Sequence, residues 1–113
     1  MRICAMLSLK SAADLRWQIA TDWLEAAQRK GHRVQFVFFY HAAAYAALNL
    51  AEAESRRWQA LAQHDDAVLM LCRTGLAQAG LSPSEATLPE PWRLGGLSQY
   101  LAAMQAADRV VSF

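Results

Sequence analysis

The sequence predicts an α/β fold, a three-layer sandwich in which helices cover both faces of a mainly parallel sheet of about four or five strands. Short apolar segments of strand length alternate with longer segments in which apolar residues recur every three or four positions. Apolar residues make up 55% of the 113 residues and charged residues 19%, which is enough material for one hydrophobic core. We therefore expect residues 1–113 to form a single domain, flavodoxin-like in general form.

A predicted strand and a predicted helix come first. Residues 3–7 are mostly apolar and give way to a polar segment at Ser8, as at the end of a buried strand. From about residue 13 to residue 30, apolar side chains recur at helical spacing. Gly31 then supplies a C-terminal stop, so we expect the helix to end there.

This predicted helix has more apolar surface than one buried face requires. Leu15, Ile19 and Trp23 widen its apolar surface beyond a single stripe. Either the helix is wedged between the sheet and a neighbouring helix, or it presents these side chains to a partner. Burial is the simpler interpretation, because most large apolar side chains lie inside a folded domain.

The middle of the chain contains a second predicted strand and two helical segments. Residues 34–40 are β-branched and aromatic and nearly apolar on both faces, as is typical of a covered parallel strand. A run of small residues that contains Tyr45 and Leu48 follows and leads toward a helix. Residues 52–63 form a further helix with Trp58 facing inward.

The last part of the chain supplies the remaining strands. Residues 67–72 form a third apolar strand, and residues 82–91, rich in proline and serine, are expected to be a loop with at most one helical turn. A short extended piece is expected near residues 92–94. An Ala-rich helix over residues 97–107 then leads into a final strand at residues 109–113.

Charge and cysteine content narrow the class of function and the compartment. Eleven basic and ten acidic side chains leave a formal net charge of +1, so no strong field steers the protein toward nucleic acid or an anionic membrane. Two cysteines, Cys4 and Cys72, are too few for a disulfide scaffold and indicate a reducing compartment, the cytoplasm. Neither a signal peptide nor a membrane span is expected from the length of the apolar runs.

Reactive groups in an open parallel sheet gather at the carboxyl ends of the strands. Seven residues follow directly on three of the predicted strands and are therefore candidates: Ser8, Lys10, Tyr40, His41, Cys72, Arg73 and Thr74. Metal and phosphate sites are not expected. The cysteines and histidines lack zinc-ligand spacing, and no Gly-rich loop follows the first strand.

Cys72 is the most informative candidate, because a thiol at a strand-to-helix junction lies over the unpaired amides of the helix start. That position stabilises a partly exposed anion by about 0.3 to 1 kcal/mol. Support from Arg73, Thr74 or a protonated His41 is expected to be needed before the thiolate predominates. By residue type alone, Cys72 is more simply a small buried hydrophobe. Cys4, inside the first strand, is expected to be an inert core thiol.

The three histidines have simpler expected roles than catalysis. His41, alone after a strand, is more often a satisfied surface group. His32 and His64 follow helices, where we expect them to cap the last carbonyls.

Several features, in this order and spacing, carry a resemblance to a known family: Gly31-His32 ending the first long helix, Val37-Phe38-Phe39-Tyr40 with Tyr45 and Asn49 after it, Leu71-Cys72 beginning a short helix that ends near Gly80, Leu94-Gly95-Gly96-Leu97, and the terminal Asp108-Arg109-Val110-Val111-Ser112-Phe113. Together they make the chain similar to the DsrE/DsrF-like sulfur-relay family, most closely its TusD and DsrE branch. The likeness spans nearly the whole chain, and Cys72 falls where that branch keeps its sulfur-carrying cysteine.

The resemblance implies a sulfurtransferase without metal or organic cofactor. Cys72 would accept sulfane sulfur as a persulfide from a donor protein and pass it to an acceptor protein. In TusD-like proteins the relay feeds 2-thiouridine formation in tRNA, and in DsrE-like proteins it belongs to sulfur oxidation. Both work as hexamers with related subunits, each a dimer of heterotrimers, so the resemblance also implies an oligomer, with no direct binding of nucleic acid or membrane.

Two segments depart from the family pattern. Residues 8–12 lack the usual Gly and Tyr of the loop after the first strand, and residues 81–93 are shorter and richer in proline. These differences leave a second hypothesis, a non-catalytic structural or interaction subunit of a related assembly. A small-molecule domain of flavodoxin type is a third and weaker one, because no phosphate loop is present.

Overall fold

The computed structural model describes the backbone of residues 1–113 and the side chains of all of them except residue 85. Five parallel strands form one sheet in the order β4-β3-β2-β1-β5. In chain order the strands are β1 (Arg2–Leu7), β2 (Arg33–Phe39), β3 (Val68–Cys72), β4 (Trp92–Gly95) and β5 (Arg109–Ser112). The α/β class and the parallel sheet predicted from the sequence are therefore confirmed.

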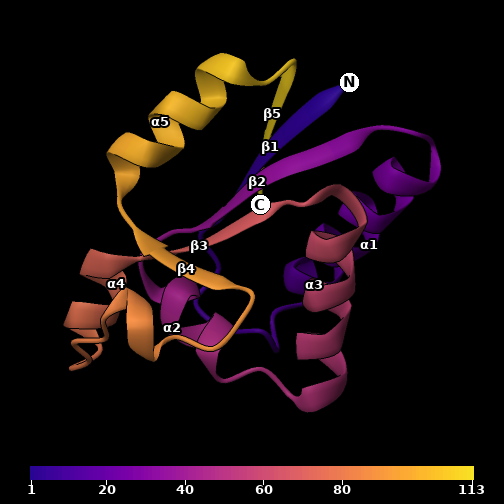
Figure 1. Cartoon of the computed structure of the whole chain (residues 1–113). Coiled ribbons are helices and arrows are strands. Elements are labelled where there is room, and N and C mark those ends of the chain that lie inside the picture. The colour runs from indigo at the N-terminus through magenta and orange to yellow at the C-terminus, as the bar shows by residue number, and fades with distance from the viewer.

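Helices connect the strands, as right-handed crossovers between parallel strands require (Figure 1). They are α1 (Leu15–Arg29), α2 (Ala42–Leu48), α3 (Glu52–Asp65), α4 (Arg73–Gln78) and α5 (Leu97–Ala106), with one 3-10 turn at Glu85–Thr87. The predicted loop at residues 82–91 thus contains a single helical turn. Gly31 has φ +88° just after α1, the left-handed conformation that ends helices.

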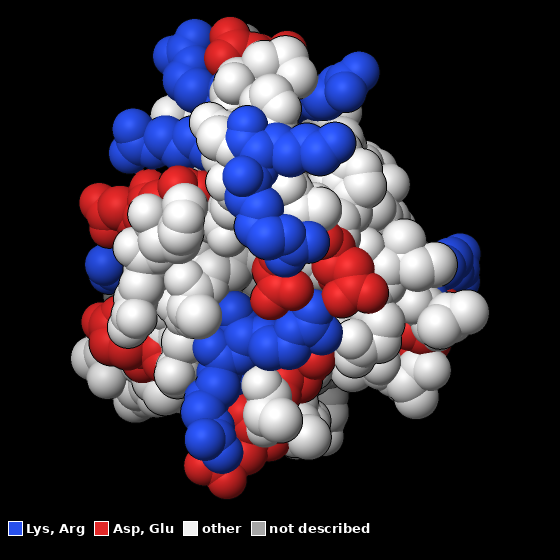
Figure 2. Space-filling model, turned by 90° about the vertical axis from the view of Figure 1, so that its right-hand side faces the viewer, with Lys and Arg blue, Asp and Glu red and all other residues white. Residues whose placement is uncertain are grey.

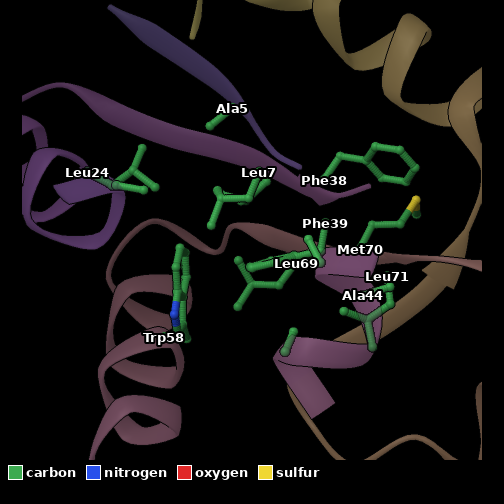
Figure 3. Packing of buried hydrophobic residues seen from close by; sticks show 14 of the residues in the cluster. Ala5, Leu7, Leu24, Phe38, Phe39, Ala44, Trp58, Leu69, Met70 and Leu71 are labelled. Atoms are coloured by element: carbon green, nitrogen blue, oxygen red, sulfur yellow. The ribbon is translucent and has the colours of Figure 1, made fainter. Parts of the chain in front are cut away.

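Two successive residues of β2 show how the layers are built. Phe38 stacks on Tyr100 of α5 with ring centroids 5.3 Å apart, whereas Phe39 packs against Trp17 of α1 and Trp58 of α3 at 5.8 and 5.1 Å. Neighbouring residues of a strand point to opposite faces, so α5 covers one face of the sheet and α1 and α3 the other. Figure 3 shows the same division, with Phe38 pointing toward α5 and Trp58 on the far side.

Charged side chains join α1 to α3 above the aromatic core. Nη2 of Arg57 lies 2.6 Å from Glu25 and 2.7 Å from Asp22, both on α1, and its Nη1 lies 3.4 Å from Glu54. Hydrogen bonds and charges from these carboxylates, Glu25 first, raise the pKa of Arg57. The lower part of the face in Figure 2 shows basic and acidic side chains interleaved.

The simpler expectation for the apolar surface of the first helix, burial, is wrong for two of its three residues. Leu15 is 75% exposed and Ile19 is 49% exposed on α1, while Trp23 is half-buried and packs against Phe113. The sheet and α3 already occupy the opposite side of α1, through Trp17, Leu24 and their neighbours. None of the described elements covers Leu15 and Ile19, so they form an open apolar surface.

Candidate functional site

Cys72 is the last residue of β3 and the N-cap of α4. The strand runs directly into the helix, without an intervening loop (Figure 1). Because all five strands are parallel, this junction lies at the same edge of the sheet as the ends of β1, β2 and β4. The structure therefore places the sulfur at the edge where open α/β sheets hold their reactive groups.

The Cys72 sulfur contacts the first turn of α4. Its Sγ lies 3.4 Å from the backbone nitrogen of Gly75, which donates to it. That amide belongs to the helix start, where backbone N–H groups lack a partner inside the helix and carry partial positive charge. The same contact stabilises a thiolate more than a thiol, since an anionic sulfur is the better acceptor.

Access to this sulfur is restricted. Cys72 is only 4% exposed, and Leu76 of α4 is fully buried close by in sequence. The side chain is therefore buried, as its residue type alone suggests. The sulfur nevertheless lies at a helix start, as expected from the sequence.

Gly75 also joins α4 to the start of α2. A Cβ at residue 75 would come closer than 3.0 Å to the backbone carbonyl of His41, so only glycine fits this approach. His41 itself has φ +56°, a backbone conformation that few residues other than glycine adopt. A hollow of about 180 Å³ lies next to the contact, and its lining includes His41, Tyr45, Gly75 and Gln78.

The structure places the predicted supporting residues, Arg73, Thr74 and His41, near this junction. None of their side chains has a described hydrogen bond to the Cys72 sulfur. Arg73 and Thr74 are exposed on the first turn of α4. The His41 ring packs edge-on against Tyr40, with centroids 5.1 Å apart, and its side chain is exposed. The structure thus brings the backbone of His41 to the helix that carries Cys72, whereas the described contacts of its imidazole are with Tyr40.

The residue that follows β1, Ser8, is hydrogen-bonded to Phe113. The nitrogen and Oγ of Ser8 both donate to the Phe113 carbonyl oxygen, at 3.0 and 3.3 Å. Lys10 instead lines a second hollow, of about 460 Å³, together with Asn49 and Tyr45. Tyr45 is 40% exposed and borders both hollows, so it separates the Lys10 side of this edge from the α4 side.

Sequence reasoning missed the two glycines that frame Cys72. Gly75 was not singled out, and Gly95 entered only as part of a resemblance. Gly95 is the residue of β4 opposite Cys72, and a Cβ there would collide with Met70 and Gln99. A Gly-Gly pair at a strand end and a Gly inside a short helix were the available signals, because both mark a close approach of neighbouring groups.

Two side-chain roles expected for histidines are wrong. His32 and His64 were expected to cap helix carbonyls, but Nδ1 of His64 lies 2.9 Å from Oδ1 of Asp65 and Nδ1 of His32 lies 3.1 Å from the nitrogen of Met1. Backbone N–H groups donate hydrogen bonds to these carbonyls instead. The nitrogens of Lys30 and His32 both donate to Ala27 O at the end of α1.

Cys4 differs from Cys72 in its place in the fold, because it lies inside a strand and not at a helix start. It is fully buried inside β1, and this burial raises the pKa of its thiol to about 11. A thiolate is therefore scarce at neutral pH.

No group of three potential metal-ligating side chains occurs among the residues that the structure describes. None of the helices described combines the length and the apolar character that a membrane span requires.

Comparisons with known proteins agree on a family and a fold. The model of the DsrE/DsrF-like family matches residues 1–113. A protein of Erwinia tasmaniensis named sulfurtransferase TusD is 29% identical over 130 aligned positions, covering 100% of both chains. A protein of Pseudomonas aeruginosa named sulfurtransferase TusD homolog is 29% identical and covers 83% of each. The crystal structure of the ychN protein from E. coli has the same fold, with a TM-score of 0.63, 20% identity and full coverage of both chains.

Proposed function

Because the chain belongs to the DsrE/DsrF-like family, we propose that it is a sulfurtransferase of a sulfur relay, in which Cys72 carries sulfane sulfur as a persulfide. Sulfur transfer in general is supported by the two relatives named sulfurtransferase TusD, one of them covered over its full length. The observation that carries the assignment to Cys72 is its hydrogen bond from the Gly75 amide at a helix start. The other thiol, Cys4, is sealed in the core.

The proposed transfer consists of two displacements at sulfur. The Cys72 thiolate attacks the terminal sulfur of a donor persulfide, the donor S–S bond breaks, and the donor leaves as a thiolate. Cys72 then holds the persulfide until an acceptor thiolate attacks its terminal sulfur and releases the Cys72 thiolate. No net oxidation occurs, and neither a metal nor an organic cofactor takes part.

The residues around Cys72 have separate roles in this proposal. The Gly75 amide stabilises the negative charge that Cys72 carries before each attack and regains after transfer to the acceptor. Arg73, exposed on the same turn, attracts an anionic donor persulfide, and Thr74 borders the approach. His41 acts mainly through its backbone, which sets the position of α4 against α2.

The burial of Cys72 requires that its cover opens during transfer. We propose that this cover includes α4, a helix of six residues whose first turn contacts the sulfur, and the segment after it is exposed. Short elements with few buried contacts open at lower free energy than the core of a domain. A donor that binds beside α4 and displaces its first turn would reach the sulfur without disturbing the sheet.

We further propose that partners are proteins and that the chain works as a single domain in the cytoplasm, in an oligomer that includes related subunits. The exposed Leu15 and Ile19 on α1 and Leu97 and Leu101 on α5 support contacts with other chains. Two destinations of the sulfur fit the family, 2-thiouridine formation in tRNA and sulfur oxidation. The relatives named TusD favour the first of these.

A second candidate function is a non-catalytic subunit of such an assembly. The observation that favours it is the 4% exposure of Cys72, together with the open apolar surface of α1. In that case the chain would bind related subunits and its thiol would never be loaded.

One experiment separates these functions. The purified protein is incubated with a low-molecular-weight persulfide donor, and intact mass spectrometry measures added mass in multiples of one sulfur atom. We expect loading of the wild type and of Cys4→Ser, and none of Cys72→Ser. Equal loading of Cys72→Ser would exclude Cys72 as the carrier. A wild type that stays unloaded while related subunits co-purify with it would support the second function.

A further inference from the structure

Three adjacent strands of the sheet each begin with an arginine. These residues are Arg2 of β1, Arg33 of β2 and Arg109 of β5, and the register pairs Arg2 with Arg33 and Ile3 with Arg109. Since the strands are parallel, the three arginines lie at one edge of the sheet, opposite the edge that carries Cys72. Positive charge is therefore concentrated there by the topology, although the chain as a whole carries only +1.

The end of α1 adds more positive charge to this edge. Arg29 is its last residue and Lys30 its C-cap, and both are exposed. Only Arg2 has an acidic partner, Asp108, at 3.2 Å. Within the part of the chain that the structure describes, the other four cations of this edge take part in no ion pair: Arg29, Lys30, Arg33 and Arg109. Figure 2 shows basic side chains gathered over the upper half of the face, with few acidic ones among them.

Two of these cations, Lys30 and Arg109, line a hollow of about 350 Å³. The rest of its wall is mostly apolar and is formed by Met1, Ile3, Trp23, Ala26 and Ala27, with His32 among them. Sites for small organic molecules have this size and this composition, a mostly apolar cavity with a few placed polar groups.

We propose that this hollow binds a small organic anion with an apolar body. Lys30 and Arg109 bind the acidic group of this anion, and Trp23 and Ile3 contact its apolar part. Lys30 is the C-cap of α1 and Arg109 is the first residue of β5, and neither pairs with a carboxylate among the described side chains. An anion placed between them removes their mutual repulsion, and an apolar body covers surface that is otherwise left to water. This site is independent of the sulfur chemistry proposed for Cys72.

The test uses 8-anilinonaphthalene-1-sulfonate, an anion with an aromatic body, as the probe. Its binding to the full chain is followed in ¹H–¹⁵N spectra through the indole N–H signals of tryptophan. The Trp23 signal is identified by its loss in Trp23→Phe. We expect the probe to shift the Trp23 signal and to leave those of Trp17 and Trp58, which are fully buried, in place.

Charge variants then test the role of the two cations. We expect Lys30→Gln and Arg109→Gln each to weaken binding about threefold to fivefold, as for other exposed ion pairs. Arg56→Gln removes an equal charge from the exposed face of α3, away from the hollow, and should leave the affinity unchanged. Added salt should weaken binding to the wild type, because the contact is ionic at an exposed site.

A neutral analogue, N-phenyl-1-naphthylamine, completes the design, because it keeps the aromatic body and lacks the charge. We expect it to bind more weakly than the anion at the Trp23 signal. Three outcomes would overturn the proposal: an unmoved Trp23 signal, equal affinity in the two charge variants and the wild type, or equal affinity for the neutral analogue. Signals that move only near Leu97 and Leu101 would do the same, since they would place the probe on α5.

Discussion

The α-carbon of Gly75 lies against the backbone carbonyl of His41, and this contact joins the first turn of α4 to the start of α2. A methyl group at residue 75 cannot be accommodated, because the atom it would meet is backbone and cannot turn aside. The position of Cys72, one turn earlier, therefore depends on a residue without a side chain.

We expect Gly75→Ala to destabilise the protein by about 1 to 3 kcal/mol, the usual cost of forcing an extra methyl group into a packed site. This reverses the ordinary effect of the substitution, since Ala is the better helix former by about 1 kcal/mol. Urea unfolding measures the difference. Gly96→Ala is the matched control, because only Gln99 comes as near as 4.0 Å to its Cβ and its φ is −137°. A loss of stability in Gly96→Ala as large as in Gly75→Ala would contradict this account.

The two thiols should differ in their reactions with an alkylating reagent. At pH 8 we expect iodoacetamide to add slowly to the native protein once, at Cys72. Cys4 should react only after unfolding, because burial raises its pKa to about 11. Intact mass spectrometry over time counts the adducts. Cys72→Ser should remain unmodified while folded, and a native adduct on Cys4 would show that the core is more open than the structure indicates.

Asp65, the last residue of α3, makes stability depend on pH. Burial opposes ionisation of Asp65, but hydrogen bonds from the backbone of Val34 and from Gln28 and His64 outweigh it and lower its pKa below the ordinary 3.8. The contribution is therefore fully present above the unfolded-state pKa and is lost as the pH falls through the lower folded-state pKa.

We expect Asp65→Asn to lower the free energy of unfolding by about 1 to 3 kcal/mol at pH 7. Below pH 4 the variant should lose less stability with falling pH than the wild type, because it lacks this carboxylate. Urea unfolding between pH 7 and pH 3 measures both. Asp66→Asn, the next position along, is the control, since Asp66 is exposed. An unchanged acid slope in Asp65→Asn would show that another carboxylate is responsible.

Arg57 should be the most sensitive charged residue on the helical face. Arg57→Met leaves Glu25 and Asp22 close together without a cation. We expect it to lower the free energy of unfolding by about 1 to 3 kcal/mol. The lower end reflects the 68% exposure of the Asp22 side chain. High salt should reduce the penalty, because it screens the repulsion between the carboxylates. Arg56→Met removes a charge from an exposed pair with Glu52 and should cost less than 1 kcal/mol.

Much of the fold could be predicted because local patterns agree with the tertiary structure. The β-branched and aromatic run before Tyr40 forms a buried strand, and Gly31 ends α1 with a positive φ as its residue type suggests. The strand that ends at Cys72 was also visible, since apolar residues stop there and a helical segment follows. In each case neighbours in the sequence determine the outcome.

The contacts that could not be predicted join residues far apart in the chain. Gly75 meets His41 only because α2 and α4 pack side by side, and a glycine in a short helix marks a close approach without telling which residue it meets. The exposure of Leu15 and Ile19 depends on which side of α1 the sheet occupies. The basic edge arises because strand order places Arg2, Arg33 and Arg109 together, a fact that net charge conceals.

The pairing of β1 with β5 has a consequence for synthesis of the chain. β1 lies between β2 and β5, so one of its hydrogen-bonding edges can be paired early, while the other waits for residues 109–112. On the ribosome, a nascent chain that has not yet released those residues presents an open strand edge beside an incomplete core. Such an edge invites pairing with other chains, so the free edge of β1 remains a site for aggregation until residues 109–112 emerge and pair with it.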